Sequence, residues 1–114
     1  MILHQGLTPE HWFTFSLMEQ LANVGTDIER TINWRNRGNK NASDAAFDRA
    51  IELLDLTIAD PKHKKQGGRL KELCRIREAL ADYFLFNNEY KSSDKLWQDY
   101  FYCFNYAAAL QRGK

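Results

Sequence analysis

Residues 69–84 read RLKELCRIREALADYF, and their pattern decides the fold. Apolar residues recur there at steps of three and four, which places them on one face of a helix. Arg77 interrupts this apolar face between Leu73 and Leu80. Because an unpaired buried charge is strongly destabilising, Arg77 requires an acid, an anion or water. The stretch therefore predicts an amphipathic helix that directs one positive charge toward its neighbours.

Three other segments show the same helical periodicity and carry start signals. Thr8 precedes Pro9, Ser43 precedes Asp44, and Ser92 or Ser93 precedes Asp94, which are the residue types preferred at helix N-termini. No stretch alternates polar and apolar residues, so strands are not expected. The sequence predicts an all-α fold, a four-helix up-and-down antiparallel bundle in one domain over residues 1–114, with helices at about 9–36, 44–60, 69–86 and 93–111.

The composition bounds the class of protein. The chain has 114 residues, 44% of them hydrophobic and 27% charged, with a formal net charge of +1. That balance gives no electrostatic argument for nucleic-acid binding. There is neither an apolar run of membrane-spanning length nor a signal-peptide pattern at the start. Cys74 and Cys103 lack metal-binding spacing and are expected to be reduced, half-buried thiols. We expect a cytoplasmic protein that does not bind membranes.

Seven Phe, five Tyr and three Trp residues exceed what a small helical core needs. Some of these rings fall on the helix sides opposite the apolar stripes. Such rings favour an interface, most simply a homodimer; alternatively, an irregular bundle wraps around them. The candidate interface residues are Trp12, Trp34, Tyr102 and Tyr106, together with the polar group Asn23, Asp27 and Arg30. That polar group is equally consistent with a solvated face carrying an Asp27–Arg30 ion pair within the helix.

The partner of Arg77 defines the second hypothesis. Glu29 lies at the border of the first helix's apolar stripe and is the best placed counter-ion, whereas Asp55 and Glu72 are less well aimed. In one interpretation Arg77 forms an internal ion pair or extends its stem to solvent. In the other, Arg77 and Glu29 line a pocket at the bundle axis, where Arg77 binds the phosphate or carboxylate of a small nucleotide-like ligand.

Basic residues gather in two predicted connectors. Arg35, Arg37 and Lys40 lie in the first, and the second contains Lys62, His63, Lys64, Lys65 and Arg69. In an up-and-down bundle these connectors lie at opposite ends, so they do not form one continuous phosphate-binding track. Solvated loops are the simpler interpretation, and RNA binding through them ranks third among the hypotheses.

Catalytic and metal-binding signatures are absent from the sequence. It contains no Glu-x-x-His, no HExxH, no glycine-rich phosphate loop and no GxSxG. His4, His11 and His63 have no partners at metal-ligand spacing. We therefore predict no catalytic residue, no metal and no cofactor, and favour a protein that is not an enzyme.

The segments SLMEQLANVGTDIERTINW, residues 16–34, and AFDRAIELLDLTIAD, residues 46–60, carry a resemblance. In organisation they resemble an uncharacterised prokaryotic four-helix-bundle family, similar to HEPN and nucleotidyltransferase substrate-binding-type domains. HEPN ribonucleases carry an arginine four to six residues before a histidine, but here only Thr57, Ile58 and Ala59 occupy that window before His63. The resemblance thus implies a partner subunit, for example of a nucleotidyltransferase-like protein. The leading hypothesis is a non-catalytic, homodimeric interaction or accessory module.

Overall fold

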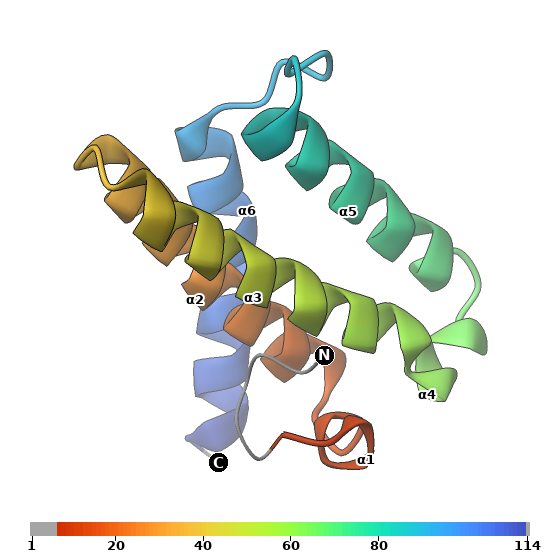
Figure 1. Cartoon of the computed structure of the whole chain (residues 1–114). Coiled ribbons are helices and arrows are strands. Elements are labelled where there is room, and N and C mark those ends of the chain that lie inside the picture. The colour runs from red at the N-terminus through yellow and green to blue at the C-terminus, as the bar shows by residue number, and fades with distance from the viewer. Residues whose placement is uncertain (1–6, 114) are drawn as a thin grey trace.

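The computed structural model describes residues 7–113, and within that range it contains six helices and no strand (Figure 1). The all-α prediction is confirmed. Four helices are long and two have a single turn. Their bounds are α1 Pro9–Trp12, α2 Leu17–Asn36, α3 Lys40–Ala59, α4 Pro61–Lys64, α5 Arg69–Leu85 and α6 Asp94–Arg112.

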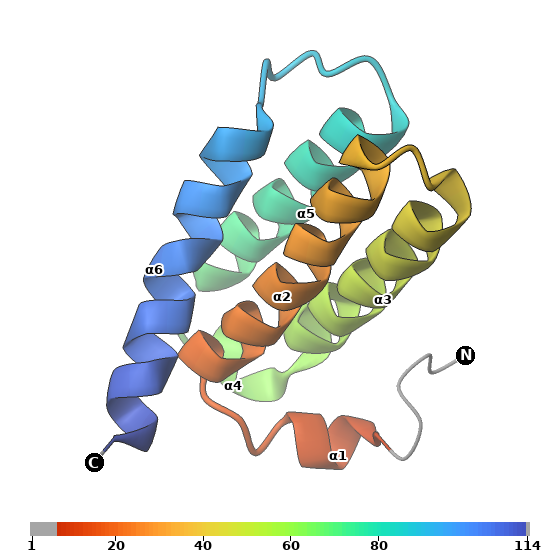
Figure 2. The ribbon, with the colours of Figure 1, turned by 90° about the vertical axis from the view of Figure 1, so that its left-hand side faces the viewer.

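The long helices are arranged around α2. Figure 2 shows α6, α2 and α3 side by side with α2 in the middle, and α5 behind them. Consecutive long helices run in alternating directions, and the short helices α1 and α4 lie at the same end of the molecule. The Cα atoms extend over 37 × 30 × 30 Å. No helix in the described range is long and apolar enough to cross a membrane.

The first predicted helix, at about 9–36, is two helices. The chain leaves α1 after Trp12 and begins α2 at Leu17, with Ser16 as the N-cap. The Ser16 hydroxyl accepts a hydrogen bond from the Glu19 amide at 3.2 Å, and the Glu19 carboxylate accepts one from the Ser16 amide at 3.0 Å. This reciprocal capping box starts a new helix. As a result α1 lies across the end of the other helices instead of extending α2.

The second predicted helix begins earlier than expected. Asn39 caps α3 by accepting a hydrogen bond from the Ala42 amide at 3.0 Å. Ser43, the predicted cap, is buried inside the helix and donates its hydroxyl proton to the Thr31 carbonyl at 2.9 Å. The predicted loop after Asp60 contains α4, which Asp60 caps by accepting from the Lys62 amide at 3.1 Å.

One apolar core joins all four long helices. Its buried members include Leu21, Val24, Ile28 and Ile32 of α2, Phe47, Leu53 and Leu54 of α3, Leu73, Ile76 and Leu80 of α5, and Trp97 and Phe101 of α6. Tyr100 lies beside them on the inner side of α6, and burial raises the pKa of its phenol to about 12. The core therefore uses the inward aromatic rings of α6.

A polar cluster closes the core at the end opposite α1. The Tyr83 hydroxyl of α5 donates to Asp94 Oδ1 at 2.6 Å, and Arg35 of α2 forms an ion pair with the same carboxylate. The Arg35 guanidinium also lies 5.2 Å from the Tyr83 ring centroid. Burial alone raises the pKa of Asp94, but the hydrogen bonds from Tyr83 and Arg35 outweigh it and the net shift is downward. These contacts hold the ends of α2, α5 and α6 together.

Candidate functional site

Arg77 lies at the surface between α5 and α3, and not at the bundle axis. Its Nε donates to Asp55 Oδ1 at 2.6 Å and its Nη2 to Oδ2 at 3.4 Å, a bidentate pair. The side chains of Arg77 and Asp55 remain 42% and 50% exposed. The prediction that Glu29 is its counter-ion was wrong. Ile76 is buried and, with Leu73 and Leu80, forms the inner face of α5. Arg77, the next residue in the chain, therefore lies at the edge of that face.

Glu29 lies on the other side of the molecule, on the face that α2 shares with α6. The Gln98 side-chain amide donates to Glu29 Oε1 at 3.4 Å, and Glu29 is exposed. Arg77 and Glu29 therefore do not line one pocket. They lie apart because Arg77 extends from α5 to Asp55 of α3, whereas Glu29 is on the edge of α2 that faces α6.

Trp12 is buried, with 2% of its surface exposed, and so is not an outward ring. Its indole Nε1 donates to the Thr57 hydroxyl of α3 at 3.1 Å, and its ring packs edge-on against Phe15. The sequence-based prediction failed here because it treated Trp12 as part of one straight helix. The turn at residues 13–16 rotates α1 so that this ring covers the end of the core.

A buried polar network lies next to Trp12 and includes His63, which the sequence suggested was a loop residue. His63 and Gln20 are fully buried, and Asp60 is 2% exposed. The Gln20 amide nitrogen donates to Asp60 Oδ2 at 2.8 Å and to the Trp12 carbonyl at 3.1 Å. Its Oε1 is then the acceptor for His63 Nε2, at 2.7 Å. The network thereby joins α1, α2 and α4.

The same contacts define the protonation state of His63. Because Nε2 donates to Gln20, Nδ1 is the lone-pair nitrogen and accepts from Arg69 Nη1 of α5 at 3.2 Å. Burial lowers the pKa of the imidazole; Asp60 opposes this, while Lys62 and Arg69 add to it. His63 is therefore held neutral, which suits a structural hydrogen-bond bridge.

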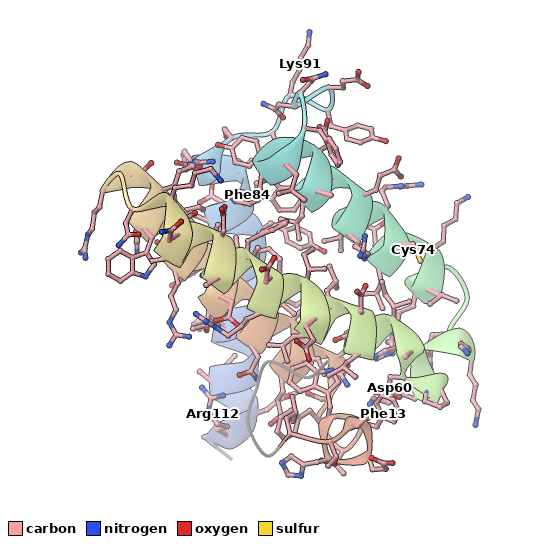
Figure 3. All side chains as sticks on the ribbon, viewed as in Figure 1. Phe13, Asp60, Cys74, Phe84, Lys91 and Arg112 are labelled. Atoms are coloured by element: carbon pink, nitrogen blue, oxygen red, sulfur yellow. The ribbon has the colours of Figure 1, made fainter. Side chains whose placement is uncertain are left out.

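Few of the second connector's basic side chains are free to form a phosphate-binding track. Lys62 pairs with Asp60 and donates to the Phe13 carbonyl at 2.9 Å; Figure 3 shows Phe13 and Asp60 close together where α1 meets α4. His63 is buried and Arg69 donates to it. Lys64 and Lys65 are the exposed members of the group.

The polar group of α2 does not form one outward strip. Asp27 is 2% exposed and faces α3, where Arg49 Nε lies 3.8 Å from its Oδ1. The predicted pair within the helix is present, since Arg30 Nη1 lies 3.0 Å from the same oxygen. Asn23 is exposed and donates to the Glu19 carbonyl at 2.8 Å. Of these three residues, Asn23 and Arg30 remain at the surface.

Tyr102 and Tyr106 are placed as predicted, on the outer side of α6. They are 66% and 59% exposed, and Leu110, one further turn along, is 53% exposed. We call Tyr102, Tyr106 and Leu110 the α6 stripe. Trp34 is 36% exposed and stacks with Arg37, 5.5 Å from the ring centroid, near the end of α2 that Asp94 contacts. It is therefore separate from the stripe, which occupies the other half of α6.

A hollow of about 350 Å³ runs beside the start of the α6 stripe. Its α2 wall contains Gly25, Ile28 and Glu29, and its α6 wall is lined by Trp97, Gln98, Asp99, Phe101, Tyr102 and Asn105. At Gly25 the two helices approach closely, since an added Cβ atom there would lie 2.7 Å from Phe101 Cβ. Stripe and hollow together offer an uneven, mostly uncharged surface.

Within residues 7–113, no group of three or more His, Cys, Asp or Glu side chains could hold a metal ion. Cys74 and Cys103 are both free and exposed, in contrast to the half-buried thiols that were expected. Comparisons of the chain with protein-family models, with curated proteins and with solved structures found no match.

Proposed function

We propose that this protein is a non-catalytic interaction module that forms a homodimer through the α6 stripe. In this proposal the four long helices act as an up-and-down antiparallel bundle, a rigid support that presents the outer face of α6. The single observation that carries the proposal is the exposure of Tyr102, Tyr106 and Leu110 on one face of that helix.

The stripe differs from an ordinary surface helix face, which is usually charged. From Tyr100 to Gln111, α6 contains no charged residue. Its inner rings are already used by the core, yet two further tyrosines and a leucine remain in water. Depletion of charge and enrichment in tyrosine are typical of the centre of protein interfaces. Both properties support the proposal that another protein surface covers the α6 stripe.

A second copy is the occupant that fits this surface best. In a two-fold antiparallel pairing of α6 with its copy centred on Tyr106, Tyr102 meets Leu110 of the other chain, and Tyr106 meets Tyr106. The pairing places apolar groups against apolar groups along the whole stripe. The nearest charges on this face, Lys95 and Asp99, already form an ion pair at 2.8 Å and lie at the edge of such a contact.

Sedimentation velocity of the purified chain over a range of concentrations tests the proposal. We expect the native protein to sediment as a dimer at low micromolar concentration, and a Tyr102→Ser/Tyr106→Ser variant as a monomer. Tyrosines at the centre of an interface commonly contribute about 2 kcal/mol each. Because a two-fold dimer loses both tyrosines from both chains, the double substitution weakens association by more than about a thousandfold. Exposed tyrosines are not needed for the fold of each chain, so the variant should keep the native circular dichroism spectrum, while its melting temperature falls because the dimer no longer stabilises the folded chain.

Tyr90→Ser is the matched control, because Tyr90 is an exposed tyrosine, 57% accessible, outside α6. It should leave the dimer intact. A native protein that sediments as a monomer up to high concentration contradicts the proposal. A dimer that survives the double substitution contradicts the role of the α6 stripe.

The two other hypotheses receive less support from the residues involved. Arg77 is neutralised by Asp55 at the surface, which engages the guanidinium that this ligand hypothesis requires. In the second connector Lys62 is engaged with Asp60 and Phe13, and Arg69 with His63, which leaves Lys64 and Lys65 as the exposed basic side chains. A protein partner such as a nucleotidyltransferase-like subunit remains compatible with the proposal, because a dimer leaves the rest of the surface free.

A further inference from the structure

A second exposed apolar patch lies at the end of α5, away from the α6 stripe. Leu85, Phe86 and Tyr90 are 58%, 72% and 57% exposed, and they are close together in the chain. Phe86 and Tyr90 line a groove of about 540 Å³ along the outer side of α5, which Cys74, Arg77, Glu78, Ala81, Asp82, Asn87 and Glu89 complete. Figure 3 shows Lys91 of the adjoining loop and Arg112 of α6 at opposite ends of the molecule.

The loop that carries these rings is held in one shape by hydrogen bonds. The Asp82 carboxylate accepts from the amides of Glu89 and Tyr90 at 2.9 and 3.0 Å. Asn88, with a φ of 53°, accepts from the Ser92 amide and donates to its carbonyl. Phe86 and Tyr90 are thus presented by an ordered loop, which lowers the entropy cost of binding a partner.

The rim of the groove is acidic. Glu78, Asp82 and Glu89 line it against one cation, Arg77, whose charge is neutralised by Asp55. Tyr90 donates its hydroxyl proton to Glu78 Oε1 at 2.9 Å. Hydrogen bonding and repulsion from Glu78 raise the pKa of the Tyr90 phenol, with further contributions from Asp82 and Glu89. The groove therefore combines aromatic faces with uncompensated negative charge.

We propose that this groove binds an extended segment of a protein partner that carries arginine or lysine next to an apolar residue. A guanidinium or ammonium group fits both features at once, because it is attracted to aromatic faces and to carboxylates. The apolar residue covers Phe86. This surface is independent of the α6 stripe, so the inference holds whether or not the chain dimerises.

Fluorescence anisotropy with a labelled peptide, Gly-Arg-Leu-Arg-Gly, tests the inference on the full chain. We expect saturable binding that weakens with added salt, and much weaker binding of the same peptide with citrulline in place of arginine. The Glu78→Gln/Glu89→Gln variant should bind about three- to tenfold more weakly, because two exposed charge pairs are lost. Phe86→Ser should also weaken binding, and it tests the aromatic contribution separately.

Glu10→Gln/Asp48→Asn is the matched control, since it removes the same charge from exposed positions on α1 and α3. It should bind the arginine peptide like the native chain. Equal binding of the arginine and citrulline peptides, or equal effects of the two double variants, overturns the inference. So does tight binding of free spermine without binding of the peptide. The Tyr102→Ser/Tyr106→Ser variant should retain full peptide affinity, which separates this inference from the proposed dimer.

Discussion

Gly25 lies where α2 and α6 come closest, and it limits how those helices pack. A Cβ atom placed on Gly25 would lie 2.7 Å from Cβ and 2.9 Å from Cγ of Phe101. Phe101 is 3% exposed and packed against Trp97 and Tyr100, so it has little room to move aside. The absence of a side chain at residue 25 therefore permits the close spacing of the two helices beside the hollow that Gly25 helps to line.

Gly25→Ala should destabilise the protein. Overpacking costs about 1–3 kcal/mol, while the better helix propensity of alanine returns up to about 1 kcal/mol. We expect a net loss of about 1–2 kcal/mol, measured as a lower midpoint in urea unfolding with the m-value unchanged. Gly67→Ala is the control, because no atom lies within 4 Å of the added methyl group and φ is not positive. If Gly25→Ala is as stable as Gly67→Ala, then α2 and α6 can move apart to accommodate the methyl group without loss of stability, and the prediction is wrong.

At the scale of helices, the molecule depends on short capping motifs that interrupt an otherwise continuous apolar pattern. Ser16 and Glu19 separate α1 from α2, and Asn39 starts α3. The Ser16 hydroxyl also donates to Gln111 Oε1 of α6 at 3.0 Å. Ser16 thus both starts the central helix and connects it to the end of the helix that carries the α6 stripe.

Ser16→Ala should lower the melting temperature. Loss of an N-cap serine costs about 0.5–2 kcal/mol, and the Glu19 carboxylate keeps only its half of the capping box. Thermal unfolding followed by circular dichroism measures the change. Ser92→Ala is the control, because Ser92 lies in the loop before α6 and its backbone makes the hydrogen bonds there. If the two variants have the same melting temperature, the capping box does not determine where α2 begins.

Prediction from the sequence succeeded for features that helical periodicity determines, and it failed for features that depend on contacts between distant parts of the chain. The all-α class, the exposed positions of Tyr102 and Tyr106 and the Asp27–Arg30 pair followed from helical spacing. The Ser16-x-x-Glu19 signal for a helix start was present but overlooked. The burial of His63 had no local signal, because it depends on Gln20, far away in the chain.

At the scale of the whole molecule, the His63 network connects helices that are far apart in the sequence. Trp12 of α1, Gln20 of α2, Asp60 before α4 and Arg69 of α5 all connect through His63 or its direct partners. A buried network of this kind stabilises the fold only while every member is satisfied. Protonation of His63 would place a second donor on Nδ1, facing the Arg69 guanidinium.

This network makes stability depend on pH in a defined window. The pKa of His63 is lowered by burial from its ordinary 6.5 in the unfolded chain, so below about pH 6.5 the unfolded state binds more protons than the folded state. The free energy of unfolding is therefore at its full value above that pH, and falls as pH drops toward the folded pKa, by at most about 1.4 kcal/mol per pH unit. Asp60, whose pKa is also lowered, acts separately below its ordinary 3.8.

Urea unfolding between about pH 7 and pH 5 measures this effect without interference from Asp60. The native chain should lose stability across the interval. His63→Gln should be less stable at neutral pH but lose much less on acidification, because glutamine does not titrate. His11→Gln serves as the control, since His11 is exposed on α1, and its pH dependence should match the native protein. Equal slopes for all three proteins would mean that His63 titrates alike in the folded and unfolded chain. Burial of His63, with the smaller contributions of Lys62 and Arg69, would then not outweigh Asp60 and would not hold the imidazole neutral.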